Sequence, residues 1–183
     1  MPQGSYLLTG PAGRPETERF SCAPGPLGWR YAATREDTVT GRRLGTVDLI
    51  VDTGGAALRL EVVRGPWVLR GGVVGGRVLW RRGEEEHEDD AAGFAGTSPG
   101  LLVAAALLAR GEELRVALAE VDDAALGVRV VRRQWRPLGE RTGSAGAPER
   151  GWLVADLDTG EGGEVWLAGD VVVEAPGCRL QLP

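Results

Sequence analysis

The chain has 183 residues, a formal net charge of −5 and a hydrophobic content of 43%. This length favours one domain, residues 1–183, that can bury a core without help from disulfides or metal ions. The acidic balance argues against nucleic acid as a partner, and the absence of lysine excludes Schiff-base and P-loop chemistry.

Residues 1–8 lack the basic and apolar regions of a secretory signal. The longest apolar run, residues 101–109, is about half of the length that crosses a bilayer. These features predict a cytoplasmic protein with no transmembrane segment. Cys22 and Cys178 should then be free thiols, because a reducing compartment disfavours disulfides.

Alternation of apolar and polar residues predicts strands in the first half of the chain. The clearest examples are residues 47–51 and 58–62. Further strands are expected at 17–22, 29–32, 67–70 and 77–82. Turns rich in Gly and Pro separate them, and the connections are too short for parallel crossovers, so we expect an antiparallel meander.

The acidic segment Glu84–Asp90 interrupts this meander and carries the only histidine, His87. Its carboxylates are of the type that binds hard divalent cations. However, the segment lacks the ligand spacing of an EF-hand, and its charges repel one another. We therefore expect a solvated, mobile loop that holds no metal ion and offers no pocket for catalysis by His87.

One helix is expected at residues 99–110. Ser98 suits the N-cap, Pro99 the first helical position and Gly111 the C′ position. Because the helix is apolar on nearly every side, it should be buried. Residues 96–100 also match the G-x-S-x-G motif of α/β-hydrolases, but Pro99 has no N–H for an oxyanion hole, so Ser98 is expected to be a cap and not a nucleophile.

After the helix, further strands are expected at 113–121, 127–135, 152–156, 164–168, 170–174 and 179–182. A flexible loop is expected at residues 140–150. The predicted fold is therefore mainly β, a curved antiparallel sheet or half-open barrel wrapped around one buried helix near residues 99–110. This architecture can leave an apolar cavity between the helix and the sheet.

The chain has six tryptophans but only two Phe and two Tyr, and the tryptophans could line such a cavity. An arginine beside one of them would place a cation at the rim to meet an anionic headgroup. The residues expected to bind the ligand are Trp67, Trp80, Trp135, Trp152, Leu101, Leu108 and Arg133. The competing interpretations are ordinary core packing for the aromatic residues and an exposed strand face for the arginine.

The second half of the chain also carries a resemblance to a known family. The resembling stretch comprises Thr97–Pro99, residues 101–108, 114–121 and 128–139, and the closing pair 152–158 and 171–177. Within it, Gln134-Trp135 is similar to a Gln-plus-aromatic strand motif. These features resemble the glycolipid-binding family of bacterial proteins, whose fold is similar to the LolA/LppX lipoprotein-carrier half-barrel. The resemblance covers about half of the chain and implies a hydrophobic groove between a helix and a concave sheet, with no catalytic residues.

Our leading hypothesis is non-enzymatic binding or carrying of an amphipathic ligand, such as a lipid or glycolipid, with no cofactor. Burial of apolar surface, at roughly 25 cal/mol per Å², can supply the affinity. The first alternative is a small hydrolase or isomerase that uses cavity carboxylates such as Asp156 or Glu120. The second is an interaction module that buries its concave face against a protein, for example as a homodimer.

Overall fold

The computed structural model describes residues 2–25, 28–144 and 146–181. Within these residues the chain forms fifteen strands, one α-helix and one short 3-10 helix. In chain order they are β1 Gln3–Thr9, η1 Pro11–Gly13, β2 Pro15–Gly25, β3 Gly28–Asp37, β4 Arg43–Asp52, β5 Ala57–Arg64, β6 Trp67–Val74, β7 Arg77–Arg82, β8 Glu85–Asp89, β9 Phe94–Ala95, α1 Pro99–Ala109, β10 Leu114–Val121, β11 Val128–Thr142, β12 Pro148–Asp156, β13 Gly162–Ala168, β14 Val171–Ala175 and β15 Cys178–Gln181.

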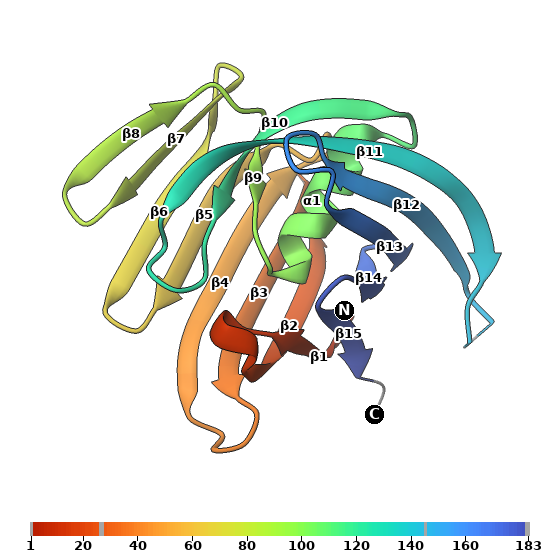
Figure 1. Cartoon of the computed structure of the whole chain (residues 1–183), viewed down its shortest axis with the longest axis horizontal. Coiled ribbons are helices and arrows are strands. Elements are labelled where there is room, and N and C mark those ends of the chain that lie inside the picture. The colour runs from red at the N-terminus through yellow and green to blue at the C-terminus, as the bar shows by residue number, and fades with distance from the viewer. Residues whose placement is uncertain (1, 26–27, 145, 182–183) are drawn as a thin grey trace.

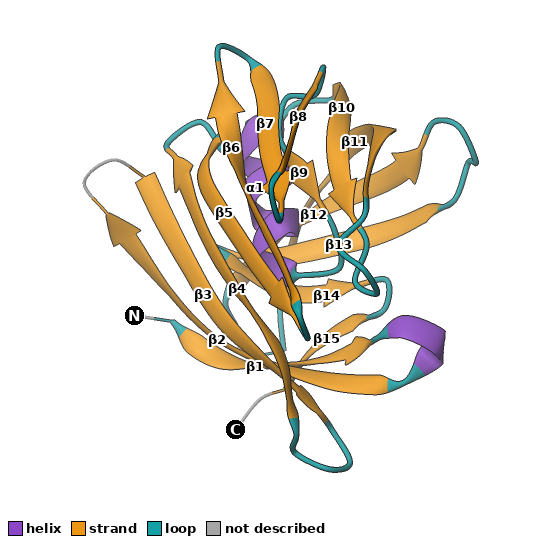
Figure 2. Ribbon diagram, turned by 90° about the vertical axis from the view of Figure 1, so that its left-hand side faces the viewer, coloured by secondary structure: helices purple, strands orange, loops and turns teal. Residues whose placement is uncertain are grey.

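All fifteen strands belong to one sheet, in the order β8-β7-β6-β5-β4-β3-β2-β1-β15-β14-β13-β12-β11-β10-β9. Strands β1 to β8 form one meander, β10 to β15 form another, and the antiparallel pair β1–β15 joins the two. The pairing is antiparallel throughout except for the short parallel contact of β9 with β10. The sheet curves strongly without closing, and α1 lies on its concave side (Figures 1 and 2). The predicted fold class is therefore confirmed.

The strands form where the alternation of the sequence places one apolar row inward. In β4, Val47, Leu49 and Val51 are fully or almost fully buried, while the intervening side chains are partly exposed. The same period of two runs through β2 and β3, because successive side chains of a strand point to opposite faces. The inward rows of both meanders and the apolar helix together make one core.

Helix α1 packs against β4 of the first meander, β14 of the second and the short strand β9. Ser98 occupies the N-cap and Pro99 the first turn, as expected, but the Ser98 side chain makes no capping hydrogen bond. Gly100 allows the first turn to approach Tyr31, since a Cβ there would lie 2.6 Å from Cδ1 of that ring. The helix ends at Ala109, the C-cap Arg110 adopts the left-handed conformation with φ of 50°, and Gly111 follows at the C′ position with φ of 84°, as expected.

The acidic segment Glu84–Asp90 is not the irregular loop that its composition suggested. Residues 85–89 form the edge strand β8, which pairs with β7 in register from Arg82 opposite Glu85 to Val78 opposite Asp89. Arg77 binds Glu88 at 2.5 Å, and the His87 ring stacks on Trp80 with a centroid separation of 4.2 Å. Cross-strand arginine and aromatic partners thus offset the repulsion within the acidic run, and charges on an edge strand discourage pairing with other chains.

The expectation of a flexible loop at residues 140–150 is also corrected. Strand β11 continues to Thr142 and β12 starts at Pro148, so that the two form a long hairpin with one irregularity between Pro137 and Gly139. Arg141 donates to Glu149 at 2.7 Å across this hairpin. Residue 145 at its tip lies outside the described residues. Cross-strand pairing, rather than local apolar alternation, therefore extends these strands.

Cys22 and Cys178 are both buried and free, as expected.

The helices of the structure were also compared with what a membrane-spanning helix requires. Within residues 2–25, 28–144 and 146–181, no helix combines the length and the apolar character that crossing a membrane requires.

Candidate functional site

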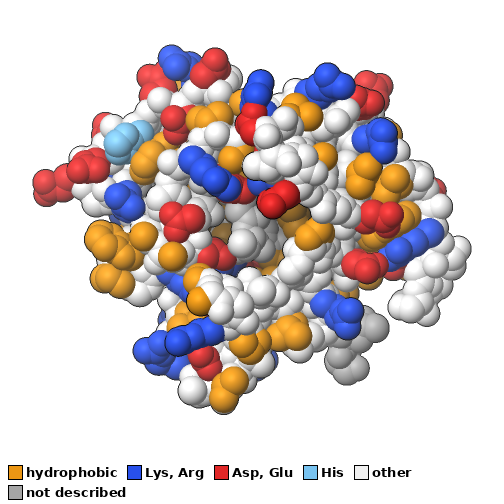
Figure 3. All heavy atoms as spheres, in the orientation of Figure 1, with side chains coloured by type: hydrophobic (Ala, Val, Ile, Leu, Met, Phe, Trp, Pro, Cys, Tyr) orange, Lys and Arg blue, Asp and Glu red, His pale blue; other side chains and the backbone are white. Residues whose placement is uncertain are grey.

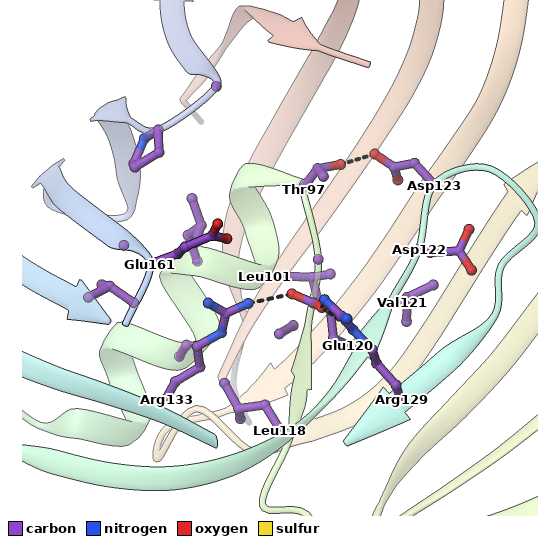
Figure 4. Close-up of a pocket in the computed structure, with 18 of the residues that line it drawn as sticks. Thr97, Leu101, Leu118, Glu120, Val121, Asp122, Asp123, Arg129, Arg133 and Glu161 are labelled. Atoms are coloured by element: carbon purple, nitrogen blue, oxygen red, sulfur yellow. Dashed lines mark hydrogen bonds and ion pairs between the residues drawn. The ribbon is translucent and has the colours of Figure 1, made fainter. Parts of the chain in front are cut away.

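A cavity of about 890 Å³ lies between α1 and the concave face of strands β10 to β13. This volume falls within the roughly 300–1,000 Å³ range of typical small-molecule sites. Figure 4 shows the site from within, and the space-filling view of Figure 3 is hollowed near the centre of the face, with charged side chains around the hollow. The cavity opens at one end of the half-barrel, where several turns meet.

The walls of the cavity are apolar. Leu101, Leu102 and Ala105 supply the helix side, because residues three and four apart, here 102 with 105 and 101 with 105, are neighbours on a helix surface. The sheet side comes from four consecutive strands, namely Leu118 and Val121 of β10, Val128 and Trp135 of β11, Val154 of β12 and Val165 of β13. An apolar ligand placed here would be removed from water on two opposite sides.

The mouth of the cavity is built from turns. Residues 9–11, 161–163 and 176–177 come from three hairpin connections, and the β10–β11 turn supplies Asp122, Asp123, Ala124 and Gly127. Asp122 shapes the last of these turns by accepting backbone N–H groups from Ala124, Ala125 and Gly127 at 2.7–2.9 Å. Burial acts to raise the pKa of Asp122, but these N–H groups outweigh it and hold the pKa below its usual value. The Asp122 carboxylate therefore stays charged.

The β10–β11 turn is fixed to the opposite meander at two points. Asp123 accepts a hydrogen bond from the Arg35 guanidinium of β3 at 2.6 Å and another from the Thr97 hydroxyl (Figure 4). Arg82 of β7 donates to the backbone carbonyl of Ala125 at 3.0 Å, and Leu126 is fully buried. The turn thus connects the two meanders of the open sheet at the cavity mouth.

A buried polar network holds the start of α1 against the sheet. Glu18, which has no exposed surface, accepts hydrogen bonds from Arg35 Nε at 2.5 Å, Tyr31 Oη at 2.5 Å and Ser98 Oγ at 2.8 Å. Burial and the adjacent Glu18 carboxylate raise the pKa of Tyr31 well above its usual value, so the phenol stays protonated as a donor. Ser98 therefore anchors the helix through Glu18, and no histidine accompanies it in this network.

Two arginines reach the cavity, and both are already paired. Arg133 Nη2 lies 2.6 Å from Glu120 and its Nη1 lies 3.4 Å from Asp156, while Arg129 Nη2 lies 2.6 Å from the other oxygen of Glu120. Figure 4 shows Glu120 between the two guanidinium groups. The neighbouring Arg132 binds Asp158 instead and is not part of the cavity lining.

The Asp156 carboxylate remains ionised. Backbone N–H groups of Thr159 and Asp158 donate to it at 3.0 and 2.8 Å, and together with Arg133 they lower its pKa below the usual value. A carboxylate stabilised in this way is a poor general acid, because catalysis of that kind needs a raised pKa.

One buried polar atom in this region has no partner. Trp135 is 1% exposed and its ring packs edge-on against Trp152 with a centroid separation of 6.0 Å. Within the described part of the chain, its Nε1 is the only buried side-chain nitrogen or oxygen without a hydrogen-bond partner. Such an atom carries a free-energy cost of about 1–3 kcal/mol.

Of the seven residues expected to bind a ligand, the structure places Leu101, Trp135 and Arg133 on the cavity. Trp152 and Leu108 lie near it but do not line it; Leu108 faces Gly93 beside Leu118, and Trp152 lines a separate space of about 300 Å³ beneath the β11–β12 hairpin.

Trp67 and Trp80 lie on β6 and β7, in the first meander, and neither lines the cavity. There Arg82 covers the Trp67 ring at 5.5 Å and Trp80 donates to Asp89 at 2.7 Å. The wall residues that sequence reasoning missed are the small and branched ones, such as Ala105 and Val154. Their position on the inward face of predicted elements was the available signal.

No protein-family model matches this chain, and no curated protein matches it either. A crystal structure of a DUF1089 family protein from Pseudomonas aeruginosa is similar in fold, with a TM-score of 0.56 and 16% sequence identity over 100% of this chain and 94% of that one. A beta-barrel-like protein of the domain of unknown function DUF1849 from Brucella abortus gives a TM-score of 0.49 and 11% identity over 99% of this chain and 97% of that one. The first likeness supports the fold, and the expected similarity to LolA/LppX carriers stays a prediction.

Proposed function

We propose that this protein binds or carries an amphipathic ligand, such as a lipid or glycolipid, without chemical transformation. The observation that supports this function best is the apolar cavity of about 890 Å³, which opens at a mouth made of polar turns. An apolar chain would lie between α1 and β10–β13, and a polar head would remain at the mouth.

The affinity expected from this arrangement is moderate. Burial of a twelve-carbon chain gives roughly 8–10 kcal/mol at about 0.8 kcal/mol per CH₂. Association and ordering cost at least about 4 kcal/mol of this, which leaves about 4–6 kcal/mol and a dissociation constant between tens of micromolar and about 1 mM.

The carboxylates nearest the cavity do not favour the alternative of a hydrolase or isomerase. Glu120 and Asp156 both bind Arg133, at 2.6 and 3.4 Å, so they are engaged in ion pairs. Paired acid and base catalysis instead needs two carboxylates whose pKa values are pushed apart. Ser98 is 2% exposed and does not line the cavity, and the Glu18 carboxylate to which it donates is already ion-paired with Arg35, so Ser98 is not placed to attack a bound substrate.

A cavity-filling variant tests the proposal. Ala105 is 3% exposed and lines the cavity, so Ala105→Trp should fill it and abolish binding of the neutral fluorophore N-phenyl-1-naphthylamine. Leu107→Trp, on the same helix but beside the separate space of about 300 Å³, is the matched control and should bind the fluorophore as the unmodified chain does if the larger cavity is the binding site.

The two variants also separate a cavity from a filled core. If the space accepts ligands, Ala105→Trp should retain most of its stability in urea, whereas in a close-packed core it should cost about 1–3 kcal/mol. Absence of fluorophore binding by the unmodified chain would remove the carrier function and leave the interaction module as the better hypothesis. Native mass spectrometry of freshly purified protein, with organic extraction, would identify any ligand retained from the cell.

A further inference from the structure

We propose that the ligand of this cavity is a cationic amphiphile, a molecule with an apolar chain and an amine or quaternary ammonium head. This inference rests on the proposed function, because it assigns the head group of the ligand that the cavity would bind. The charges at the cavity mouth carry it.

The first step concerns the positive charges. Arg129 and Arg133 are the arginines that line the cavity, and both bind Glu120 at 2.6 Å. Arg133 also has Asp156 at 3.4 Å. Arg129 is 75% exposed and pairs with Glu120 only through Nε and Nη2, but the two guanidinium groups and the two carboxylates that lie against them carry no net charge. This cluster therefore offers an anionic head group no net electrostatic attraction. The geometry therefore disfavours a carboxylate, phosphate or sulfate head.

The second step concerns the negative charges. Glu161 and Asp122 both line the mouth, and among the described residues neither has an arginine nitrogen or other cationic atom within 4.0 Å. Asp122 stays ionised because the N–H groups of its turn lower its pKa against the effect of burial. In Figure 4, Glu161 extends from the β12–β13 turn toward the space beside α1.

The third step is the balance of charge around the opening. Four carboxylates and two guanidinium groups line the cavity, and the ion pairs behind them add Arg35, Glu18 and Asp156. The field at the mouth is therefore negative, and the apolar walls focus it, since low-dielectric surroundings strengthen electrostatic interactions. An ammonium head at the mouth would meet the Glu161 carboxylate and the field of Asp122, whose oxygens are held by the N–H groups of its own turn, while its chain lies against Leu101 and Leu118.

Three ligands with the same chain length test the assignment. Dodecyltrimethylammonium, dodecanoate and 1-monolauroylglycerol, each below its critical micelle concentration, would compete with N-phenyl-1-naphthylamine at low ionic strength. We expect the cation to bind at least tenfold more tightly than dodecanoate and at least threefold more tightly than the neutral glyceride. The preference should weaken at 0.5 M salt, because exposed charges are screened.

Glu161→Gln is the variant that tests the site, and Glu84→Gln is its matched control. Both residues are exposed and both substitutions remove one negative charge, but Glu84 lies in the turn between β7 and β8 and not at the cavity. Glu161→Gln should weaken dodecyltrimethylammonium binding at least threefold and leave the glyceride unchanged. Glu84→Gln should change neither.

The outcomes separate this proposal from the proposed function. If dodecanoate or the glyceride binds as tightly as the cation, or if both glutamine variants weaken the cation equally, the cationic assignment is wrong while the carrier function stands. If no member of the series displaces the fluorophore and the fluorophore itself does not bind, both proposals are wrong.

Discussion

Arg35 is the position at which one substitution should cost the fold most. Its guanidinium is 4% exposed and donates to Glu18 at 2.5 Å, to Asp123 at 2.6 Å and to Thr97 at 3.0 Å. Through these groups it connects β2, the start of α1 and the turn at the cavity mouth. We expect Arg35→Met to leave the Glu18 charge buried without its counterion.

The size of the effect follows from that uncompensated charge. Removal of one partner from a buried ion pair costs about 3–5 kcal/mol. With a urea dependence of about 2 kcal/mol per M, the unfolding midpoint should fall by about 1.5–2.5 M. Since domains of this kind are stable by roughly 5–15 kcal/mol, the variant should lose a large fraction of its free energy of unfolding.

The matched control is Arg30→Met on the same strand. Arg30 binds Asp48 at 2.9 Å, but 60% of its side chain is exposed, so its loss should cost no more than about 1 kcal/mol. Urea unfolding followed by circular dichroism and tryptophan fluorescence would measure both. The double variant Glu18→Gln/Arg35→Met should recover at least about 1 kcal/mol relative to Arg35→Met, since it also removes the buried charge. Equal losses for Arg35→Met and Arg30→Met, or no recovery in the double variant, would refute the reasoning.

Three further predictions concern the helix anchor and one thiol. Gly100→Ala should destabilise the fold by about 1–3 kcal/mol in urea, although alanine favours helices, because its Cβ would lie 2.6 Å from the Tyr31 ring; a gain in stability would contradict this. Ser98→Ala should cost about 1.5–3 kcal/mol through the lost hydrogen bond to Glu18, and the unmodified chain should not react with a fluorophosphonate, so stoichiometric labelling at Ser98 would disprove the anchoring role. Burial raises the pKa of the Cys22 thiol from about 9 to about 11, so the unfolded chain loses this proton first and stability should fall as the pH rises from 9 toward 11; Cys22→Ala should reduce that dependence.

Local alternation was sufficient to predict most strands and the helix. The run from Val47 to Val51 and the helix beginning at Pro99 carry their own period and boundary residues, so no long-range information was required. Strand β8 could not be predicted in this way, because its acidic residues become favourable only opposite Arg77 and Trp80 of the preceding strand. Charge repulsion within one segment is therefore a poor guide when a cross-strand partner is near.

The candidate site was harder to predict than the fold, because it depends on which strands meet. Trp67 is in phase with the buried Leu69, yet it is 46% exposed and lies in the first meander, whereas Trp135 is buried in the meander that faces α1 across the cavity. Whether the Arg133 guanidinium is ion-paired depends on Glu120 and Asp156, which come from the strands on either side of β11. Sequence alone presented this arginine as a free cation at the rim, whereas the structure places it between two carboxylates.

The pairing of β1 with β15, in which Ser5 lies opposite Gln181, has a consequence for the assembly of the chain. During synthesis the first meander can form early, but the open side of β1 then stays unpaired until residues 178–181 leave the ribosome. That side exposes backbone hydrogen-bonding groups beside the apolar rings of Tyr6 and Phe20, which stack at 4.6 Å. The position most open to aggregation in the nascent protein is thus the middle of the finished sheet and not either of its outer edges. Closure of this late, long-range seam is also expected to limit the folding rate.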